Sequence, residues 1–255
     1  MQRLPITLSS SLKALSLEQN CTLFMTLLAA FKTLLYYLTG QTDISVGTDI
    51  ANRNRAETEK LIGFFVNQLV LRAELSRDFT FEELLKKVRK ITLEAYAHQD
   101  LPFEKLVEAL NPDRDGNRTP LFQVKMALQN APGGDLSLSG LTISPVMSSV
   151  DTAKFDLLLN LNDSEHGLSA SLQYNTDLFE ESTPTRILKR FHTLLDRIVE
   201  RPGARLQELV ESLIEEDHRE ALEKEEQLES IRLGTLKGVK RKPSVKRSRR
   251  RNPEK

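Results

Sequence analysis

Residues 61–75 form the segment that most constrains what this chain can fold into. Apolar side chains follow one another here too closely for a strand with one solvent-facing side, in which apolar and polar residues alternate. We therefore predict that the run is covered on both of its faces. The apolar residues concerned are Ile62, Phe64, Phe65, Val66, Leu69, Val70 and Leu71.

Two capping boxes predict helices on either side of this run. Ser16 to Gln19 fits the pattern S-x-x-Q, and the leucines that follow recur at helical spacing. This predicts a buried helix from Leu17 to Leu38 that ends at Gly40. Thr80, with a glutamate three residues later, predicts a second helix that runs to about residue 97.

The rest of the chain predicts a mixed sheet and two more helices. Pro102 suits the first turn of a short helix to Leu110, with Asp100 as its cap, and Thr183 can cap a helix to Val199. Helices and strands do not alternate regularly, so the predicted fold class is an α/β (α+β) sandwich with helices packed on a mixed, mostly antiparallel sheet. The predicted strands are Ile44–Thr48, Leu121–Gln129, Leu141–Val146, Phe155–Asn162 and Leu168–Tyr174.

The net charge of zero is an average over unlike parts. Residues 234–255 hold ten basic side chains and one acid, and residues 208–233 hold ten acids and three bases. The first 207 residues therefore carry a net charge of −2, which is typical of a globular surface and not of a nucleic-acid footprint. We predict a folded domain over residues 1–207, an acidic helical linker over 208–233 and a basic disordered tail over 234–255.

The cysteine content indicates a reducing compartment, and the hydropathy does not indicate a membrane span. Cys21 is the single cysteine, so neither an intramolecular disulfide nor a cysteine-based zinc site can form. The most apolar window, Leu23 to Leu38, is interrupted by polar residues and is shorter than a membrane span of about 20 residues. The amino terminus does not resemble a secretory signal. We expect a cytoplasmic protein without a membrane partner.

No residue cluster typical of an enzyme centre occurs in the sequence. The four histidines are not adjacent to one another, and none has the spacing of a zinc-binding helix. Neither a phosphate-binding glycine loop nor a G-x-S-x-G elbow is present. His98 is the histidine for which a role remains open, because a residue between two helices can bind their ends or face a cleft.

Three segments in order carry a resemblance to a known family. They are Leu61-Ile-Gly-Phe-Phe-Val-Asn-Gln-Leu-Val-Leu-Arg72, His98-Gln-Asp-Leu-Pro-Phe-Glu104 and Arg114-Asp-Gly-Asn-Arg-Thr-Pro-Leu121. With their spacing, they make residues 4–201 resemble the carboxy-terminal half of a condensation domain from non-ribosomal peptide synthetases. That family implies a chloramphenicol-acetyltransferase-like half-domain, two of which form a V around a tunnel.

The resemblance implies amide-bond formation between thioesters held on the phosphopantetheine arms of carrier proteins, with no cofactor bound directly. The family's His-His-x-x-x-Asp-Gly motif belongs to the amino-terminal half, and this chain contains no His-His pair. No catalytic residue is therefore carried over, and His98 belongs to a different motif. The implied partners are carrier proteins and an amino-terminal half, with self-association as a further possibility.

The resemblance places six residues on the tunnel wall: Gly63, Phe65, Asn67, Gln68, His98 and Gln99. The family usually has threonine where this chain has Gln68. A structural interpretation stays open beside this one, in which Phe65 and its neighbours are core and Asn67 caps a bulge. Arg72 can likewise pair with a carboxylate or guide an acidic arm. The alternative function is a non-catalytic module that binds a carrier protein or a synthetase, and the basic tail is the one segment suited to nucleic acid.

Overall fold

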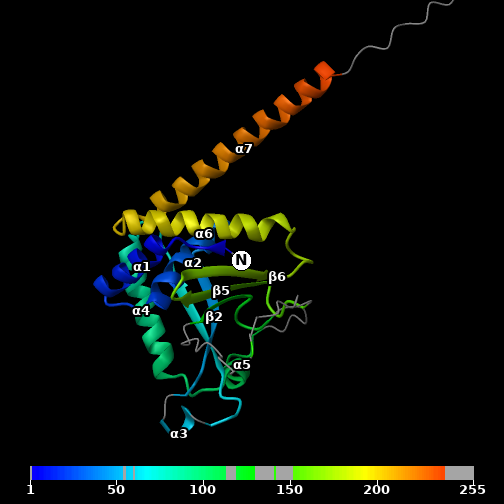
Figure 1. Ribbon diagram of the computed structural model, residues 1–255. Coiled ribbons are helices and arrows are strands. Elements are labelled where there is room, and N and C mark those ends of the chain that lie inside the picture. The colour runs from blue at the N-terminus through cyan, green and yellow to red at the C-terminus, as the bar shows by residue number, and fades with distance from the viewer. Residues whose placement is uncertain are drawn as a thin grey trace, which may run out of the picture. The chain divides into compact units, whose positions relative to one another are not determined.

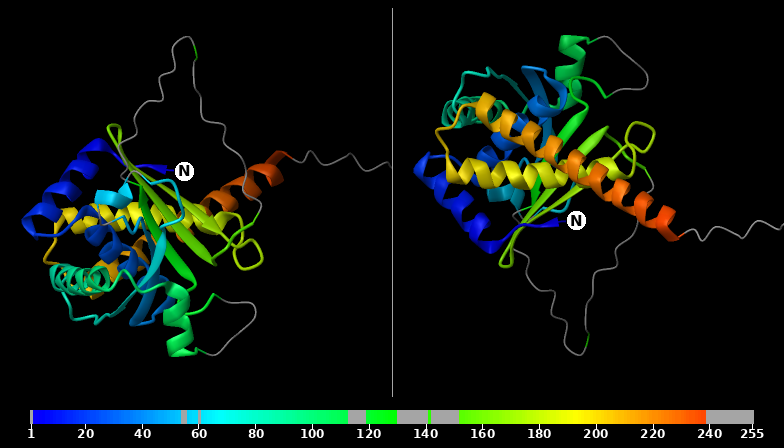
Figure 2. Two further views of the ribbon diagram at one scale, coloured as in Figure 1. Left: turned by 90° about the horizontal axis from the view of Figure 1, so that it is seen from below. Right: turned by 90° about the horizontal axis from the view of Figure 1, so that it is seen from above.

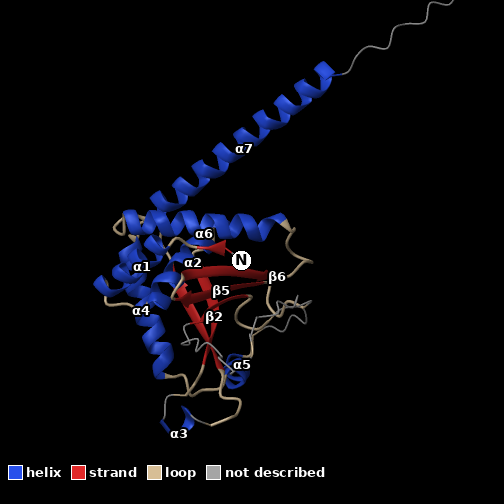
Figure 3. Cartoon of the chain, viewed as in Figure 1, coloured by secondary structure: helices blue, strands red, loops and turns tan. Residues whose placement is uncertain are grey.

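The computed structural model describes residues 2–53, 56–59, 61–112, 119–129, 141 and 152–238. The chain divides into two compact units, Met1–Leu213 and Ile214–Lys255. The first unit contains all the strands and the helices up to the start of α7 (Figures 1 and 3). The elements in order are β1 (Gln2–Arg3), α1 (Ile6–Glu18), α2 (Leu23–Thr39), β2 (Asp43–Ile50), α3 (Ala56–Glu59), β3 (Asn67–Glu74), α4 (Phe81–Ala97), α5 (Phe103–Leu110), β4 (Val124–Gln129), β5 (Leu157–Ser164), β6 (Gly167–Tyr174), α6 (Ser182–Glu200) and α7 (Leu206–Gly238).

The strands form one open sheet in the order β1-β6-β5-β4-β2-β3. The pairs β1/β6, β5/β6 and β2/β3 are antiparallel, whereas β4 runs parallel to both β5 and β2. Strands β2 and β3 pair along their whole length, from Asp43↔Glu74 to Ile50↔Asn67. In contrast, the described residues of β2 and β4 pair only at Gly47↔Lys125. The predicted α/β fold with a mixed sheet is therefore confirmed.

Helices α1, α2, α4 and α6 gather on one face of this sheet (Figures 1 and 2). Helix α2 contacts α1, α4 and α6 and lies deepest in the core, with its central residues fully buried. The strands present alternate side chains to these helices, for example Leu69, Leu71 and Ala73 of β3. Strand β3 is therefore covered by helices on one face, and the prediction of cover on both faces is wrong for it.

The predicted helix from Leu17 to Leu38 is two helices. Ser16 lies inside α1, and α2 begins instead at Leu23, capped by Thr22, whose hydroxyl accepts a hydrogen bond from the N–H of Met25. The leucine spacing continued through the break, and so concealed it. The end at Gly40 is correct, because this glycine adopts a left-handed φ of 69° and closes α2.

Other predicted boundaries had mixed outcomes. The capping box at Thr80 is present, with both its hydrogen bonds to Glu83. Thr183 lies inside α6, whose preceding residue is Glu181, so its predicted role as a cap is wrong. The predicted strand Leu141–Val146 lies, apart from Leu141, outside the described residues.

Helix α7 passes through residues 207 and 233, where the sequence predicted domain boundaries. Its first turns belong to the first unit, in which Leu206, Leu209 and Leu213 are buried. Residues 239–255, most of the predicted tail, lie outside the described residues. In the part of the chain that the structure describes, no single helix is long and apolar enough to span a membrane. Only α1 and α2 joined, at a bend of 104°, have that length and composition.

Candidate functional site

Asn67 joins the first two motifs of the resemblance. Its Nδ2 atom donates hydrogen bonds to the carbonyl oxygens of Gln99 and Leu101, each at 2.8 Å. Its Oδ1 atom accepts from the N–H groups of Gln68, at 2.9 Å, and Phe103, at 3.1 Å. A side-chain amide has two N–H donors and two acceptor lone pairs, so all four are used. Asn67 therefore ties the start of β3 to the turn between α4 and α5.

This arrangement corrects the predicted start of α5. The residue before the helix is Pro102, and it provides no side-chain cap. The N–H of Phe103, one of the groups that a helix start leaves without an internal partner, donates to Asn67 instead. The residue that binds this N–H group therefore lies on a strand, 36 positions before Phe103 in the sequence.

A hollow of about 510 Å³ lies beside this junction. Phe65, Asn67 and Gln68 line it, so the structure brings these three predicted site residues together. The remaining lining residues are Asn52, Phe64, Val66, Asp100, Pro102, Phe103 and Glu104. None of the described lining residues is basic. We call this space the motif hollow.

The other three predicted site residues do not line the motif hollow. His98 is the exposed residue that ends α4, and its carbonyl oxygen accepts from the N–H of Leu101. Gln99 contributes its backbone carbonyl to Asn67. Gly63 has no left-handed φ, and a Cβ atom there would lie 3.1 Å from the ring of Phe65. The close approach of the Phe65 ring, and not an unusual backbone torsion, therefore accounts for glycine at position 63.

Arg53 organises the segment that precedes β3. Its guanidinium donates hydrogen bonds to the carbonyl oxygens of Thr58, Leu61 and Gly63, and it lies 4.3 Å from the centre of the Phe65 ring. A planar guanidinium with five donors is suited to holding several carbonyls of an irregular segment at once. Apart from the position of Arg53 in a polar loop, no sequence signal pointed to this role.

Three aromatic rings connect the motif hollow to β4 and β5. Phe122 lies 5.6 Å from Phe103 on one side and 5.6 Å from Phe155 on the other, measured between ring centres. A Cβ atom at Gly47 would come within 2.2 Å of the Phe122 ring, so the ring needs glycine at this place in β2. Phe122 directly follows Leu121, the last residue of the third motif, so the chain leaves that motif beside Phe103 of the second one.

An ion pair between a buried lysine and a partly exposed aspartate lies next to Gln68. Lys125 has only 6% of its side chain exposed, and its Nζ donates to Oδ1 of Asp49 at 2.6 Å. The same oxygen accepts from Nε2 of Gln68 at 3.3 Å. The Lys125 Nζ also lies 4.6 Å from the centre of the Phe155 ring, which is favourable for a cation. Sequence reasoning missed both Asp49 and Lys125, because their pairing joins positions 76 residues apart.

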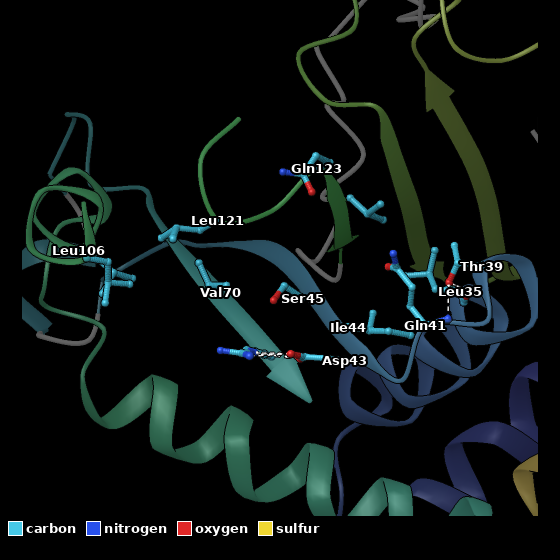
Figure 4. A pocket seen from close by; sticks show the side chains of 13 residues that line it. Leu35, Thr39, Gln41, Asp43, Ile44, Ser45, Val70, Leu106, Leu121 and Gln123 are labelled. Carbon is cyan, nitrogen blue, oxygen red and sulfur yellow. Dashed lines mark hydrogen bonds and ion pairs between the residues drawn. The ribbon is translucent and has the colours of Figure 1, made fainter. Parts of the chain in front are cut away.

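A second hollow of about 600 Å³ opens where β2 and β4 separate (Figure 4). Arg72 and Asp43 line it from the paired strands β3 and β2, and Arg72 binds both carboxylate oxygens of Asp43, with a shortest N–O distance of 2.6 Å. The hydrogen bonds from Arg72 hold the pKa of Asp43 below its usual range. Of the two roles open to Arg72, pairing with a carboxylate is therefore the one observed. Arg118 and the rest of residues 113–118 lie outside the described residues.

The described residues of the motif hollow offer hydrogen-bond acceptors, apolar surface and fixed backbone. Among them no histidine, serine or cysteine is positioned as a nucleophile with a base. No group of three His, Cys, Asp or Glu side chains in the described ranges could hold a metal ion. The chemistry that this arrangement supports is binding and positioning of another molecule.

Comparison with known proteins places these motifs in one family. Residues 2–223 match the Condensation domain family. A subunit of the linear gramicidin synthase of Brevibacillus parabrevis is 48% identical over 220 residues, which is 86% of this chain and 3% of that protein. Surfactin synthase subunit 1 of Bacillus subtilis is 45% identical over 180 residues, 70% of this chain and 5% of that protein. The chain thus spans only a few per cent of the length of these relatives.

Solved structures agree in fold. The X-domain from teicoplanin biosynthesis is 28% identical with a TM-score of 0.74, covering 80% of this chain and 47% of the solved one. The condensation domain of the monacolin K polyketide synthase MokA has a TM-score of 0.74 with the same coverage, and at 23% identity shows the fold alone. Since the family match extends over residues 2–223 and the gramicidin synthase subunit is 48% identical over 86% of this chain, the chain belongs to the condensation-domain family of non-ribosomal peptide synthetases.

Proposed function

We propose that this chain serves as the carboxy-terminal half of a condensation domain and forms one wall of the tunnel in which an amide bond is made. Its substrates are aminoacyl and peptidyl thioesters presented on the phosphopantetheine arms of carrier proteins. It binds no cofactor of its own. The carrier proteins and an amino-terminal half are its partners.

The observation that carries the proposal is the meeting of the first two sequence motifs at the motif hollow. Asn67 fixes the second motif to the first, and Phe122 packs against Phe103 of the second. Amide formation requires an amine and a thioester carbonyl to be held together, and such positioning can contribute about 7–11 kcal/mol at its upper end. A wall of this kind contributes by positioning.

The proposal assigns the histidine chemistry to another segment of polypeptide, because the four histidines of this chain contain no adjacent pair. The test is to mix the chain with an amino-terminal half that carries His-His-x-x-x-Asp-Gly and with two loaded carrier proteins. Formation of a dipeptidyl thioester, detected by mass spectrometry, is the expected result. The matched control replaces the second histidine of that half with alanine and should abolish the product. A folded complex that makes no product contradicts the proposal.

One observation favours a second function, that of a non-catalytic module that binds a carrier protein or a synthetase. Side chains of the first motif are exposed before β3: Ile62 is 105% exposed and Phe64 is 91% exposed. Exposed apolar side chains close together in sequence are typical of interaction surfaces. Capture of carrier proteins that is lost in Phe64→Ser and kept in the matched control Leu178→Ser, without any complementation, would favour this function.

Self-association is the third possibility for the same surface. Two copies would then cover each other's exposed residues. Sedimentation of the chain at several concentrations distinguishes this case, because a monomer throughout the series removes it.

A further inference from the structure

The side-chain amide oxygen of Gln68, unlike that of its neighbour Asn67, accepts no hydrogen bond from the described residues. The Nε2 atom of Gln68 donates to Asp49, but none of the described residues donates to the Oε1 atom. Since the carboxylate of Asp49 is already paired with Lys125, it can only accept hydrogen bonds. The NH₂ side of Gln68 must therefore face Asp49, and the amide cannot flip without setting oxygen against oxygen. The Oε1 atom is left on the opposite side of the amide, and Gln68 lines the motif hollow.

The rest of the motif hollow also favours a hydrogen-bond donor. Glu104 contributes a carboxylate, and the Oδ1 atom of Asn52 is buried without a partner among the described residues. Rings of Phe64 and Phe103 add apolar surface to which an ammonium group is also attracted.

Two positive groups near the motif hollow are already occupied. The first N–H of α5 is taken by Asn67, and Glu104 in the first turn offsets the positive end of the helix. The guanidinium of Arg53 lies against Phe65 and binds three backbone carbonyls, and Arg53 is not among the lining residues. An anion would therefore meet no positively charged side chain among the described residues that line the motif hollow.

We propose that the motif hollow binds an amine carried on an apolar body, and that Gln68 accepts a hydrogen bond from it through Oε1. Asp49 and Lys125 act as positioning residues that hold the Gln68 amide in this orientation. The inference rests on the proposed function and narrows it, since it assigns the motif hollow to the amine-bearing substrate. An ammonium and a neutral amine both carry N–H donors, so either form satisfies the same acceptor.

The test uses two small probes that differ only in the amine. Leucinamide carries an α-amine, 4-methylpentanamide lacks it, and both share the same apolar chain and carboxamide. Titration of each into ¹⁵N-labelled chain, below the α-amino pKa of about 7.7–8.0, is followed by NMR. We expect leucinamide to bind about tenfold more tightly, the effect of one hydrogen bond to a charged group. The shifts should centre on the amides of Gln68 and Phe103.

Gln68→Met keeps the length of the side chain and removes the acceptor, so it should abolish the preference for leucinamide. Gln68→Thr, the residue usual in the family, gives a second variant whose hydroxyl is too short to replace Oε1, and it should also lose the preference. Gln41→Leu, in the second hollow, is the matched control and should keep it. Equal binding of the two probes by the unaltered chain, or an unchanged preference in either Gln68 variant, overturns the inference. So do shifts that centre on Ser45 and Arg72 of the second hollow.

These titrations need no second protein, so their failure is distinct from a failure of the complementation assay. A preference for leucinamide without dipeptide formation would leave the inference standing and remove the proposed function. Dipeptide formation with an unchanged KM for the amine substrate in Gln68→Met would do the reverse.

Discussion

Residues 61–66 and residues 67–74 belong to one apolar run, yet the structure treats them differently. The second part is strand β3, paired along its length with β2 and buried on alternate side chains. The first part is irregular and exposed, and Arg53 holds it through backbone carbonyls. Strand pairing and cover by helices begin at Asn67. An apolar run therefore does not by itself decide burial, which requires another element within reach.

The largest expected loss of stability comes from shortening a buried side chain in residues 67–74. Leu71 is 1% exposed, so Leu71→Ala should lower the free energy of unfolding by about 2–5 kcal/mol because a cavity remains. Ile62→Ala should change it by no more than about 0.5 kcal/mol. Urea unfolding of both variants checks the comparison. Equal losses would show that residues 61–66 are packed in solution.

Lys32, which is buried against β2 and β3, should make the stability of the fold depend on pH. Its Nζ donates to the carbonyls of Ile44 and Leu71, each at 2.7 Å, and burial lowers its pKa from 10.5 to about 7. Between these two values the unfolded chain binds more protons, so the free energy of unfolding should rise with pH. The rise attributable to Lys32 is roughly 2 kcal/mol from pH 7 to pH 9.

The measurement is urea unfolding at several pH values, with Lys32→Met as the reference that removes this titration and keeps the others. If the free energies of unfolding of the two proteins differ by the same amount at every pH between 7 and 9, the lowered pKa of Lys32 is contradicted.

Asn67 marks the boundary between the two parts. Asn67→Ala removes four hydrogen bonds and leaves the N–H of Phe103 without its partner, so stability should fall by about 1–3 kcal/mol. Hydrogen exchange at Phe103 should accelerate as well. Asn67→Asp keeps both acceptor bonds and should protect this amide better than alanine does. Unchanged exchange in Asn67→Ala would mean that α5 is held by other contacts.

The smallest effect on stability is expected for Arg53. Because the segment it organises is exposed, Arg53→Ala should change the free energy of unfolding by less than about 1 kcal/mol. Limited proteolysis should nevertheless cut residues 58–66 faster, since three carbonyls lose their common donor. Arg53→Lys, which keeps the charge but not the fork of donors, should be cut almost as fast. Unaltered cleavage would show that Arg53 does not order the segment.

Local features of the sequence predicted much of the fold. The capping box at Thr80, the glycine that ends α2 and the strands β5 and β6 were predictable because each depends on residues close together in the chain. The motifs likewise predicted Phe65, Asn67 and Gln68 as neighbours at one place, and all three line the motif hollow.

The tertiary structure alone decided what those residues do. Three of the four hydrogen bonds of the Asn67 side chain join groups 32 to 36 positions away, and Gln68 is oriented by Asp49 and, through it, by Lys125. Periodicity and capping act within a few residues, so they report helices and strands but not which element covers which. Hydrogen bonds and burial between distant segments depend on how the sheet and helices pack. That packing exposes Phe64, buries Lys32 and leaves the oxygen of Gln68 available to a ligand.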